Sequence, residues 1–197
     1  MITRVLLFIK HHLPWVWQLV EWLNARLFEL LHRRRMQRQT QRAFAEFSLE
    51  GFSFRPIRSE ELPQLMALLE RQGEARLHYF RPHDFTLLSL RRVCANPAFL
   101  MFGVWDDHGT LVGYFFLRCF WNHRCFVGRL IDQPSEGQGI GRVMNQIMYH
   151  TAWWSGFRCM TTISKHNHAV MRSHQNNPHA RIVGELSNDY LLVEFVS

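Results

Sequence analysis

The chain has 197 residues with 47% hydrophobic content, which can bury one substantial core and hardly two, so we expect one catalytic-size domain with an appendage. Its formal net charge is +7, and +5 of this belongs to residues 1–49, which hold eight Lys and Arg against three Glu. Four cysteines show neither the paired spacing of a zinc site nor the density of a secreted disulfide scaffold, which favours a reducing compartment.

The first segment of the chain is predicted to form an amphipathic helix. Its apolar positions recur at intervals of three and four: Val5, Ile9, Leu13, Val16, Val20, Leu23, Leu27 and Leu30. This spacing puts them on one face, opposite a more polar face, and Pro14 predicts a bend or a restart. Four charged residues, from Lys10 to Glu29, interrupt the segment too often for the roughly 20 nearly uncharged residues that cross a bilayer. The short apolar run that ends at Lys10 also does not match a secretory signal.

A basic stretch follows this apolar stripe, with Arg33, Arg34, Arg35, Arg38 and Arg42. Each cation gains up to about 1 kcal/mol at an anionic leaflet, and tryptophans such as Trp15 and Trp22 suit the headgroup region. We therefore expect a peripheral attachment at the inner, cytoplasmic face of the membrane. Two alternatives stay open, in which the stripe packs on the rest of the chain or pairs with its copy in a homodimer. Nucleic acid is a poorer partner, because no motif places a helix or stacking aromatics on bases.

The middle and end of the chain predict a mixed sheet with helices on its faces. Alternation over residues 52–57 predicts a strand, and Ser59 with the acidic residues after it is typical of a helix start. Aromatic and β-branched runs predict strands at residues 98–105, 111–120 and 124–131, connected by short polar turns. The remaining predicted elements are helices at 140–154 and 167–175 and strands at 158–163, 181–185 and 189–196.

The strand at 124–131 leads into a turn with glycines at alternate positions, Gly137, Gly139 and Gly141. Without Cβ atoms a ligand can approach closely, and positive φ angles let successive amides point at one place. The helix that follows adds its unpaired N-terminal amides to the same turn. This pattern predicts a phosphate-binding turn. It is not the dinucleotide fingerprint, which Arg142 breaks, and no Gly-Lys-Ser/Thr follows as in a P-loop.

Residues Glu136 to Gly141 resemble the acetyl-CoA-binding motif of the GCN5-related N-acetyltransferase (GNAT) superfamily, in which Gln or Arg precedes two residues, Gly, one residue, and Gly or Ala. Gly139 and Gly141 match, and Glu136 stands at the position of Gln or Arg. Asn167 matches a later motif in which Tyr follows seven residues on, where this chain has His174. The resemblance covers about residues 50 to 197. It implies an α/β (α+β) fold with a mixed, mostly antiparallel sheet flanked by helices, which leaves residues 1–49 as an amphipathic, basic helical extension.

The resemblance implies that acetyl-CoA is the co-substrate, and we expect no metal. The residues implied for acetyl-CoA binding are Gly137, Gln138, Gly139, Ile140, Gly141, Arg142 and Asn167, with a main-chain amide near Ile131 polarising the thioester carbonyl. Direct transfer to an amine then needs a base, a polarising donor and an acid for the thiolate. The histidines between 166 and 179 do not indicate a metal site, because no Cys or carboxylate completes a ligand set at their spacing.

His174 is the candidate acid, because it replaces the superfamily's Tyr. A Tyr with a pKa of about 10 keeps its proton at neutral pH, whereas a His near 6.5 keeps it about a quarter of the time, so we expect a more acidic activity profile. A purely structural role of this helix histidine is the alternative. Asp132 is the candidate base, as the carboxylate at the strand end. It could instead cap the glycine turn, with water or His123 as the base.

Acceptor contacts are expected from residues 78–84, which lie where the superfamily's first two helices cover the substrate cleft. Tyr79 and His83 can stack on rings, and Arg81 can pair with phosphate or carboxylate. Arg118 and Arg129 lie inside apolar strands, where a charge needs a partner or a ligand, with internal salt bridges as the alternative. Together these residues favour a small anionic acceptor, such as a nucleotide- or lipid-linked amino sugar, over a polyamine or an aminoglycoside.

The predicted protein is therefore an acetyl-CoA-dependent N-acetyltransferase of a membrane-associated amino sugar, and O-acetylation is a close variant. A protein or peptide N-acetyltransferase is a second interpretation. A third is a non-catalytic, CoA-binding interaction module at the membrane, which the departures from the superfamily motifs at Glu136 and His174 would suit.

Overall fold

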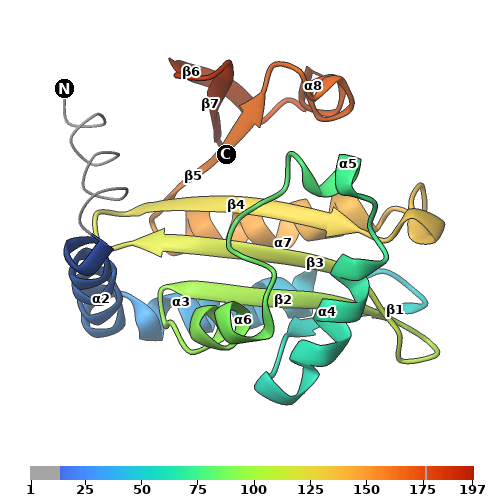
Figure 1. Ribbon diagram of the computed structural model, residues 1–197, viewed down its shortest axis with the longest axis horizontal. Coiled ribbons are helices and arrows are strands. Elements are labelled where there is room, and N and C mark those ends of the chain that lie inside the picture. Colours follow the sequence, from blue (N-terminus) through green and yellow to red (C-terminus); the bar gives the residue numbers. More distant parts are fainter. Residues whose placement is uncertain (1–13, 176) are drawn as a thin grey trace.

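Seven strands form one sheet in the computed structural model, which describes residues 14–175 and 177–197 (Figure 1). The strand order is β1-β2-β3-β4-β5-β7-β6, and every neighbouring pair is antiparallel except β4 and β5, which are parallel. The strands are β1 (Phe52–Pro56), β2 (Phe99–Asp106), β3 (Leu111–Phe120), β4 (Arg124–Ile131), β5 (Arg158–Ser164), β6 (Ala180–Leu186) and β7 (Tyr190–Phe195). The mixed, mostly antiparallel sheet predicted from the sequence is confirmed.

Helices cover both faces of this sheet. They are α2 (Pro14–Leu31), α3 (Arg33–Glu46), α4 (Leu62–Glu70), α5 (Glu74–Leu77), α6 (Leu87–Cys94), α7 (Ile140–Trp154) and α8 (His168–Gln175), with short 3-10 turns η1 (Ser59–Glu61) and η2 (Gln133–Ser135). In Figure 1, α4 and α6 lie in front of the sheet, and α3 and α7 lie behind it. The helix expected at the glycine turn is α7, and it spans the predicted residues.

Each face of the sheet has its own buried cluster. On the α7 face, Val143, Met144 and Ile147 pack against sheet residues such as Phe115 and Val127. On the opposite face, the leucines of α4 pack with residues from β2, β3 and the end of β4. Aromatic and branched side chains therefore face inward from both sides of the central strands, which explains their nearly continuous apolar sequence.

The start of α4 differs from the expected serine cap. The Ser59 hydroxyl donates to Glu60 instead of accepting from the helix. The Arg58 main-chain N–H donates to Glu61 Oε2 at 2.9 Å, so the carboxylate of Glu61 closes this turn. The prediction of a strand followed by a helix holds, because an acidic side chain performs the capping that Ser was expected to perform.

The helical extension forms two helices that meet at His32. The predicted positions Val5, Ile9 and Leu13 lie outside the described residues, and the described part begins with α2 at Pro14. On α3, Met36 and Ala43 are fully buried in the core that α7 shares with the sheet. Residues 1–49, as far as they are described, therefore contribute to the same core as the rest of the chain.

Apart from Phe28, which is buried in the core, the polar side of α2 faces the sheet and its apolar side faces outward. Asn24 Nδ2 donates to the carbonyl of Cys119 at 3.0 Å, and Asn24 Oδ1 accepts from the amide of Trp121 at 3.0 Å. Glu21 pairs with Arg118 of β3. In contrast, Leu19 is 48% exposed and Leu30 is 81% exposed. The alternative in which the apolar stripe packs on the rest of the chain does not hold for this helix.

Candidate active site

The two halves of the sheet separate between β4 and β5. Ladder pairing between these strands ends at Phe126 and Met160, although β4 continues to Ile131 and β5 to Ser164. A cavity of about 630 Å³ fills the space between the diverging strands. It is lined from one side by α7 and α8 and from the other by Tyr79 and Phe80, which follow α5. A ligand in this cavity can therefore be reached from both faces of the sheet.

Two main-chain amides of β4 point into this opening. The amide of Asp132 donates to the Val112 carbonyl on β3 at 2.8 Å. Because donors alternate between the two edges of an antiparallel strand, the amides of Arg129 and Ile131 face away from β3, toward β5. Ladder pairing with β5 has already ended at Phe126, so both amides are available to a ligand. The expectation of an available amide near Ile131 thus has a structural basis.

The glycine turn lies between the end of β4 and the start of α7. Gly137 and Gly139 have φ angles of 77° and 88°, which strongly favour glycine. Gly139 is the N-cap of α7. Among the residues that the structure describes, no acceptor pairs with the amides of Gln138, Gly139, Ile140 or Gly141. These donors and the positive end of the helix form an arrangement suited to phosphate.

Glu136, at the motif position where the superfamily has Gln or Arg, forms an ion pair with Arg76. Arg76 Nη2 also donates to the carbonyl of Ile131 at 2.9 Å. The pair joins the residues of α5 to the glycine turn and neutralises the carboxylate. Sequence reasoning did not single out Arg76, because its partner lies 60 residues away along the chain.

Arg129 lines the cavity from β4. Its Nε donates to Asn145 Oδ1 of α7 at 2.9 Å, and no carboxylate in the described part of the chain forms an ion pair with it. Burial lowers the pKa of its guanidinium, against the opposing influence of Tyr149 and Glu136. A Cβ added to Gly141 would lie 2.8 Å from Arg129 Nη1, so the guanidinium sits against the first turn of α7.

Asp132, the candidate base, is held by several hydrogen bonds in this geometry. Its carboxylate accepts from Arg71 and Gln72, at 2.8 Å in each case, and from the amide of Gln133 at 3.1 Å. Burial raises the pKa of Asp132, but the hydrogen bonds from Gln72 and Arg71 outweigh this effect and the pKa is lowered. A carboxylate that is fully engaged and absent from the cavity wall is poorly placed to take a proton from an amine, so capping is the better interpretation.

Three of the residues expected to bind the acceptor lie away from the cavity wall. Arg118 is paired with Glu21 of α2, and this internal salt bridge accounts for a charge inside an apolar strand. His83 donates through Nδ1 to the Asp84 carbonyl at 3.0 Å and accepts at Nε2, 2.9 Å from the Tyr114 hydroxyl. Arg81 is exposed. Tyr79 and Arg129 remain as the predicted acceptor-binding residues that line the cavity.

The far wall of the cavity carries Asn167, at the start of α8. Its Oδ1 accepts from the amide of Val170 at 3.2 Å. His174 belongs to the same helix, but its side chain lies outside the described residues. His123, the alternative base, lies in the β3–β4 turn, where Nδ1 donates to the Gly156 carbonyl at 3.2 Å, and it does not line the cavity.

Tyr149 of α7 is a cavity residue that the sequence analysis missed. Its ring stacks on Phe195 at a centroid distance of 4.3 Å, and its hydroxyl accepts from Asn177 Nδ2 at 3.3 Å. Burial raises the pKa of this phenol well above its ordinary value. Tyr149 occupies an inward position of an amphipathic helix, so its sequence pattern is that of an ordinary core residue.

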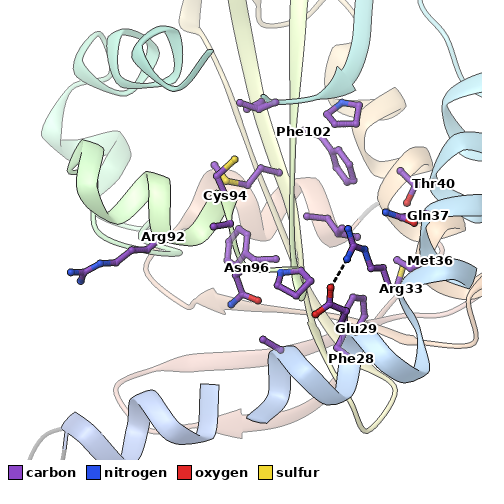
Figure 2. A pocket seen from close by; sticks show the side chains of 18 of the residues that line it. Phe28, Glu29, Arg33, Met36, Gln37, Thr40, Arg92, Cys94, Asn96 and Phe102 are labelled. Carbon is purple, nitrogen blue, oxygen red and sulfur yellow. Dashed lines mark hydrogen bonds and ion pairs between the residues drawn. The ribbon is translucent and has the colours of Figure 1, made fainter. Parts of the chain in front are cut away.

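A second cavity, of about 690 Å³, lies between the N-terminal helices, the start of β2 and the end of α6 (Figure 2). Phe28, Met36 and Phe102 contribute apolar wall, and the Arg33–Glu29 ion pair lies beside it. None of its wall residues comes from β4, α7 or α8, so it does not communicate with the glycine turn. In the described parts of the chain, no group of three or more His, Cys, Asp or Glu could hold a metal ion.

Comparisons with known proteins identify the fold. No family model matches the sequence, and no curated protein matches it. The GNAT domain of PAT from S. lividans superposes with a TM-score of 0.62 at 12% identity, over 72% of this chain and 88% of that one. PaiA N-acetyltransferase from Thermoplasma acidophilum, in complex with coenzyme A, superposes with a TM-score of 0.61 at 13% identity, over 74% of this chain and 99% of that one. Ribosomal-protein-S5-alanine acetyltransferase from Vibrio fischeri superposes with a TM-score of 0.62 at 17% identity, over 76% of this chain and 95% of that one. The chain has the GNAT fold, as the sequence resemblance implied.

Proposed function

We propose that this chain, which has the fold of the GCN5-related N-acetyltransferases, transfers an acetyl group from acetyl-CoA to a primary amine. The supporting observation combines three neighbouring features: strands that diverge around a cavity, two amides of β4 that face it, and a glycine turn that begins beside the cavity residue Glu136 and whose described amides lack acceptors. A complex of the similar protein PaiA with coenzyme A adds support for the ligand. The residues proposed to hold it are Ile131, the turn from Gly137 to Arg142, and Asn167.

The chain's own groups suit direct transfer. The amides of Arg129 and Ile131 can donate to a carbonyl oxygen that becomes negative as the amine attacks, which stabilises the tetrahedral intermediate. The C–N bond forms, the C–S bond breaks, and the amine loses a proton. Among the described residues that line the cavity, Glu136 is the one carboxylate, and Arg76 already pairs with it. We therefore assign the proton acceptance to water and keep His174 as the proposed acid for the thiolate.

The charge on the cavity wall restricts the acceptor. Its charged side chains are Arg76, Arg129 and Glu136, so no free carboxylate in the described wall would bind a polyamine or an aminoglycoside. An uncharged or anionic amine, such as a nucleotide- or lipid-linked amino sugar, does not need a carboxylate in the wall to bind it. The aromatic rings of Tyr79 and Phe80 on the acceptor side suit stacking against a sugar or base.

An acceptor panel tests this proposal. Purified protein is incubated with acetyl-CoA and with amino sugars, nucleotide-linked amino sugars, peptides with free N-termini, or polyamines, and the released thiol is measured. We expect turnover with the amino-sugar group and none with spermidine. Turnover of peptides alone would favour a protein N-acetyltransferase, the activity named for the Vibrio fischeri protein. Binding of CoA without thiol release from any acceptor would favour the non-catalytic module.

We also propose that α2 attaches the protein to an anionic membrane surface. Eight large apolar side chains of this helix are exposed: Trp15, Leu19, Val20, Trp22, Leu23, Leu27, Leu30 and Leu31. An outward apolar face of this size on an amphipathic helix is typical of an interfacial helix or a protein contact. On α3, Arg34 and Arg38 are exposed and have no ion-pair partner in the described part of the chain, which favours an anionic surface. No described helix has the length and apolar character to cross a bilayer.

Vesicle flotation separates the membrane from a second copy of the chain. We expect the protein to float with vesicles of phosphatidylglycerol and phosphatidylcholine and to float less in high salt. The triple variant Leu19→Gln, Leu23→Gln, Leu30→Gln should stay unbound. The control Leu88→Gln, at a 61% exposed leucine of α6, should float like the natural protein. No flotation, together with a dimer in light scattering that the triple variant dissociates, would overturn the membrane proposal in favour of a homodimer.

A further inference from the structure

Arg129 is a half-buried cation that has no ion-pair partner among the described residues. Among the described residues, its one hydrogen-bonded side-chain partner is the neutral Asn145, which accepts from Nε. A buried charge is costly unless it is paired, because burial removes its hydration. The two terminal nitrogens of this guanidinium have no acceptor among the described residues, so they are available to a ligand.

These terminal nitrogens lie at the glycine turn. Nη1 is 2.8 Å from the position that a Cβ of residue 141 would occupy, and Gly141 belongs to the first turn of α7. The unpaired amides of residues 138–141 lie in the same place. A guanidinium and the positive end of a helix thus meet without an anion between them, and such an arrangement is stable when an anion binds.

No other described charge nearby balances the positive charge of Arg129. Glu136 is the nearest carboxylate in the sequence of the turn, but it forms its ion pair with Arg76. That pair is neutral as a unit. Arg129 therefore supplies the net positive charge of the cavity wall, in a chain whose motif position 136 holds a carboxylate instead of Gln or Arg.

We propose that Arg129 binds the diphosphate group of the CoA thioester, instead of the acceptor. This inference rests on the proposed function. The guanidinium donates through its terminal nitrogens to phosphate oxygens from the β4 side, while the amides of Gly139 to Gly141 donate from the α7 side. The side chain of β4 thereby replaces the contribution that Glu136 cannot make to phosphate binding.

The test compares ligands that differ in their phosphates. Affinities of the natural protein and of Arg129→Met are measured by calorimetry for CoA and for dephospho-CoA, which keeps the diphosphate but lacks the ribose phosphate. Pantetheine, which has no phosphate, is titrated by competition. We expect Arg129→Met to weaken CoA and dephospho-CoA equally, by roughly tenfold to a hundredfold, and to leave pantetheine unchanged. Arg91→Met, at an exposed arginine of α6, is the matched control and should change none of these affinities.

Each other result has a distinct meaning. If Arg129→Met weakens the affinity for CoA alone, Arg129 binds the ribose phosphate. If it weakens the affinities for all three ligands equally, Arg129 is a structural residue. An unchanged CoA affinity with a raised KM for the acceptor would return Arg129 to acceptor binding. All three outcomes overturn the proposal. If the natural protein binds none of the ligands, the proposed function itself fails.

Gly141 provides a second test that does not depend on removing the arginine. Gly141→Ala places a Cβ where it displaces the guanidinium, so we expect it to weaken CoA binding. In the Arg129→Met background the same substitution should reduce CoA affinity much less, because the guanidinium that the Cβ displaces is gone. Additive losses in this double-mutant cycle would show that the two residues act independently, against the proposal.

Discussion

Arg71 donates to Oδ2 of Asp132 through both Nε and Nη2, at 3.0 and 2.8 Å. Arg71 follows the last residue of α4, and Asp132 follows the last residue of β4, directly before the glycine turn. The ion pair therefore connects the front helix layer to the segment that positions the proposed phosphate site. Gln72 adds a third side-chain hydrogen bond to the same carboxylate, at 2.8 Å to Oδ1.

Asp132→Asn should destabilise the fold and leave catalysis nearly intact. The substitution removes the ion pair and leaves Arg71 without its anion, at a cost of about 1–2 kcal/mol, a value reduced because Arg71 is partly exposed. Thermal unfolding at neutral pH measures this cost, with Asp107→Asn in the exposed β2–β3 turn as the control. A drop in kcat of about 10²-fold or more would restore Asp132 as the general base.

The same carboxylate should contribute to acid sensitivity. Its folded-state pKa is lowered, so its contribution to stability is fully present above the unfolded value of about 3.9 and is lost as pH falls through the folded value. The stability difference between the natural protein and Asp132→Asn should thus shrink below about pH 4. Denaturant titrations at several acidic pH values measure this, and a difference independent of pH would contradict it.

Gly139→Ala should impair ligand binding through the backbone. The φ angle of 88° lies in the left-handed region, where a Cβ costs roughly 1–2 kcal/mol, while the nearest side-chain atoms, from Leu49, are at an unstrained 3.9 Å. The strain is thus conformational, and the turn should relax away from the geometry that aims its amides. The control is Gly73→Ala, where φ is −62° and nothing lies within 4 Å; as the N-cap of α5 it should lose at most about 1 kcal/mol of stability, and its CoA affinity should stay unchanged. Equal CoA affinities for both variants would contradict this account.

The strands and the glycine turn were predictable because their signals are local. Residues 111–120 and 124–131 form strands with the predicted bounds, since aromatic and branched runs are delimited there by turn residues. Positive φ at Gly137 and Gly139 follows from the same local pattern. The divergence of β4 from β5 was not predictable, because it depends on which strands pair and where that pairing ends.

Arginines inside strands show the limit of sequence reasoning. Arg118 and Arg129 have the same pattern, a single cation in an apolar run, and both were expected at the acceptor. One meets Glu21, 97 residues away on α2, and the other faces a cavity without a carboxylate partner in the described chain. Similarly, the amphipathic character of α2 was evident, but its inverted orientation was not. Asn24 faces the sheet because the main chain at the β3–β4 turn hydrogen-bonds to it, and Glu21 faces the sheet because it pairs with Arg118.

Arg118→Met should leave the kinetics unchanged. Its guanidinium pairs with Glu21 away from the cavity, and both side chains are more than a third exposed. We therefore expect a stability loss of at most about 1 kcal/mol and faster hydrogen exchange in α2, with no change in the KM for the acceptor. A KM raised severalfold, without loss of α2 protection, would place Arg118 at the acceptor after all.

His174→Phe should lower kcat by about 10²-fold or more, if the histidine donates the proton that the leaving thiolate takes. The active form is then the protonated imidazole, so kcat of the natural protein should rise as pH falls through about 6.5, and the variant should lose this dependence. Tyr149→Phe is the informative comparison, because this phenol lines the cavity and burial keeps its pKa high, so it stays protonated at neutral pH. If His174→Phe matches the natural protein from about pH 6 to 9 while Tyr149→Phe loses activity, the proton comes from α7 instead of α8.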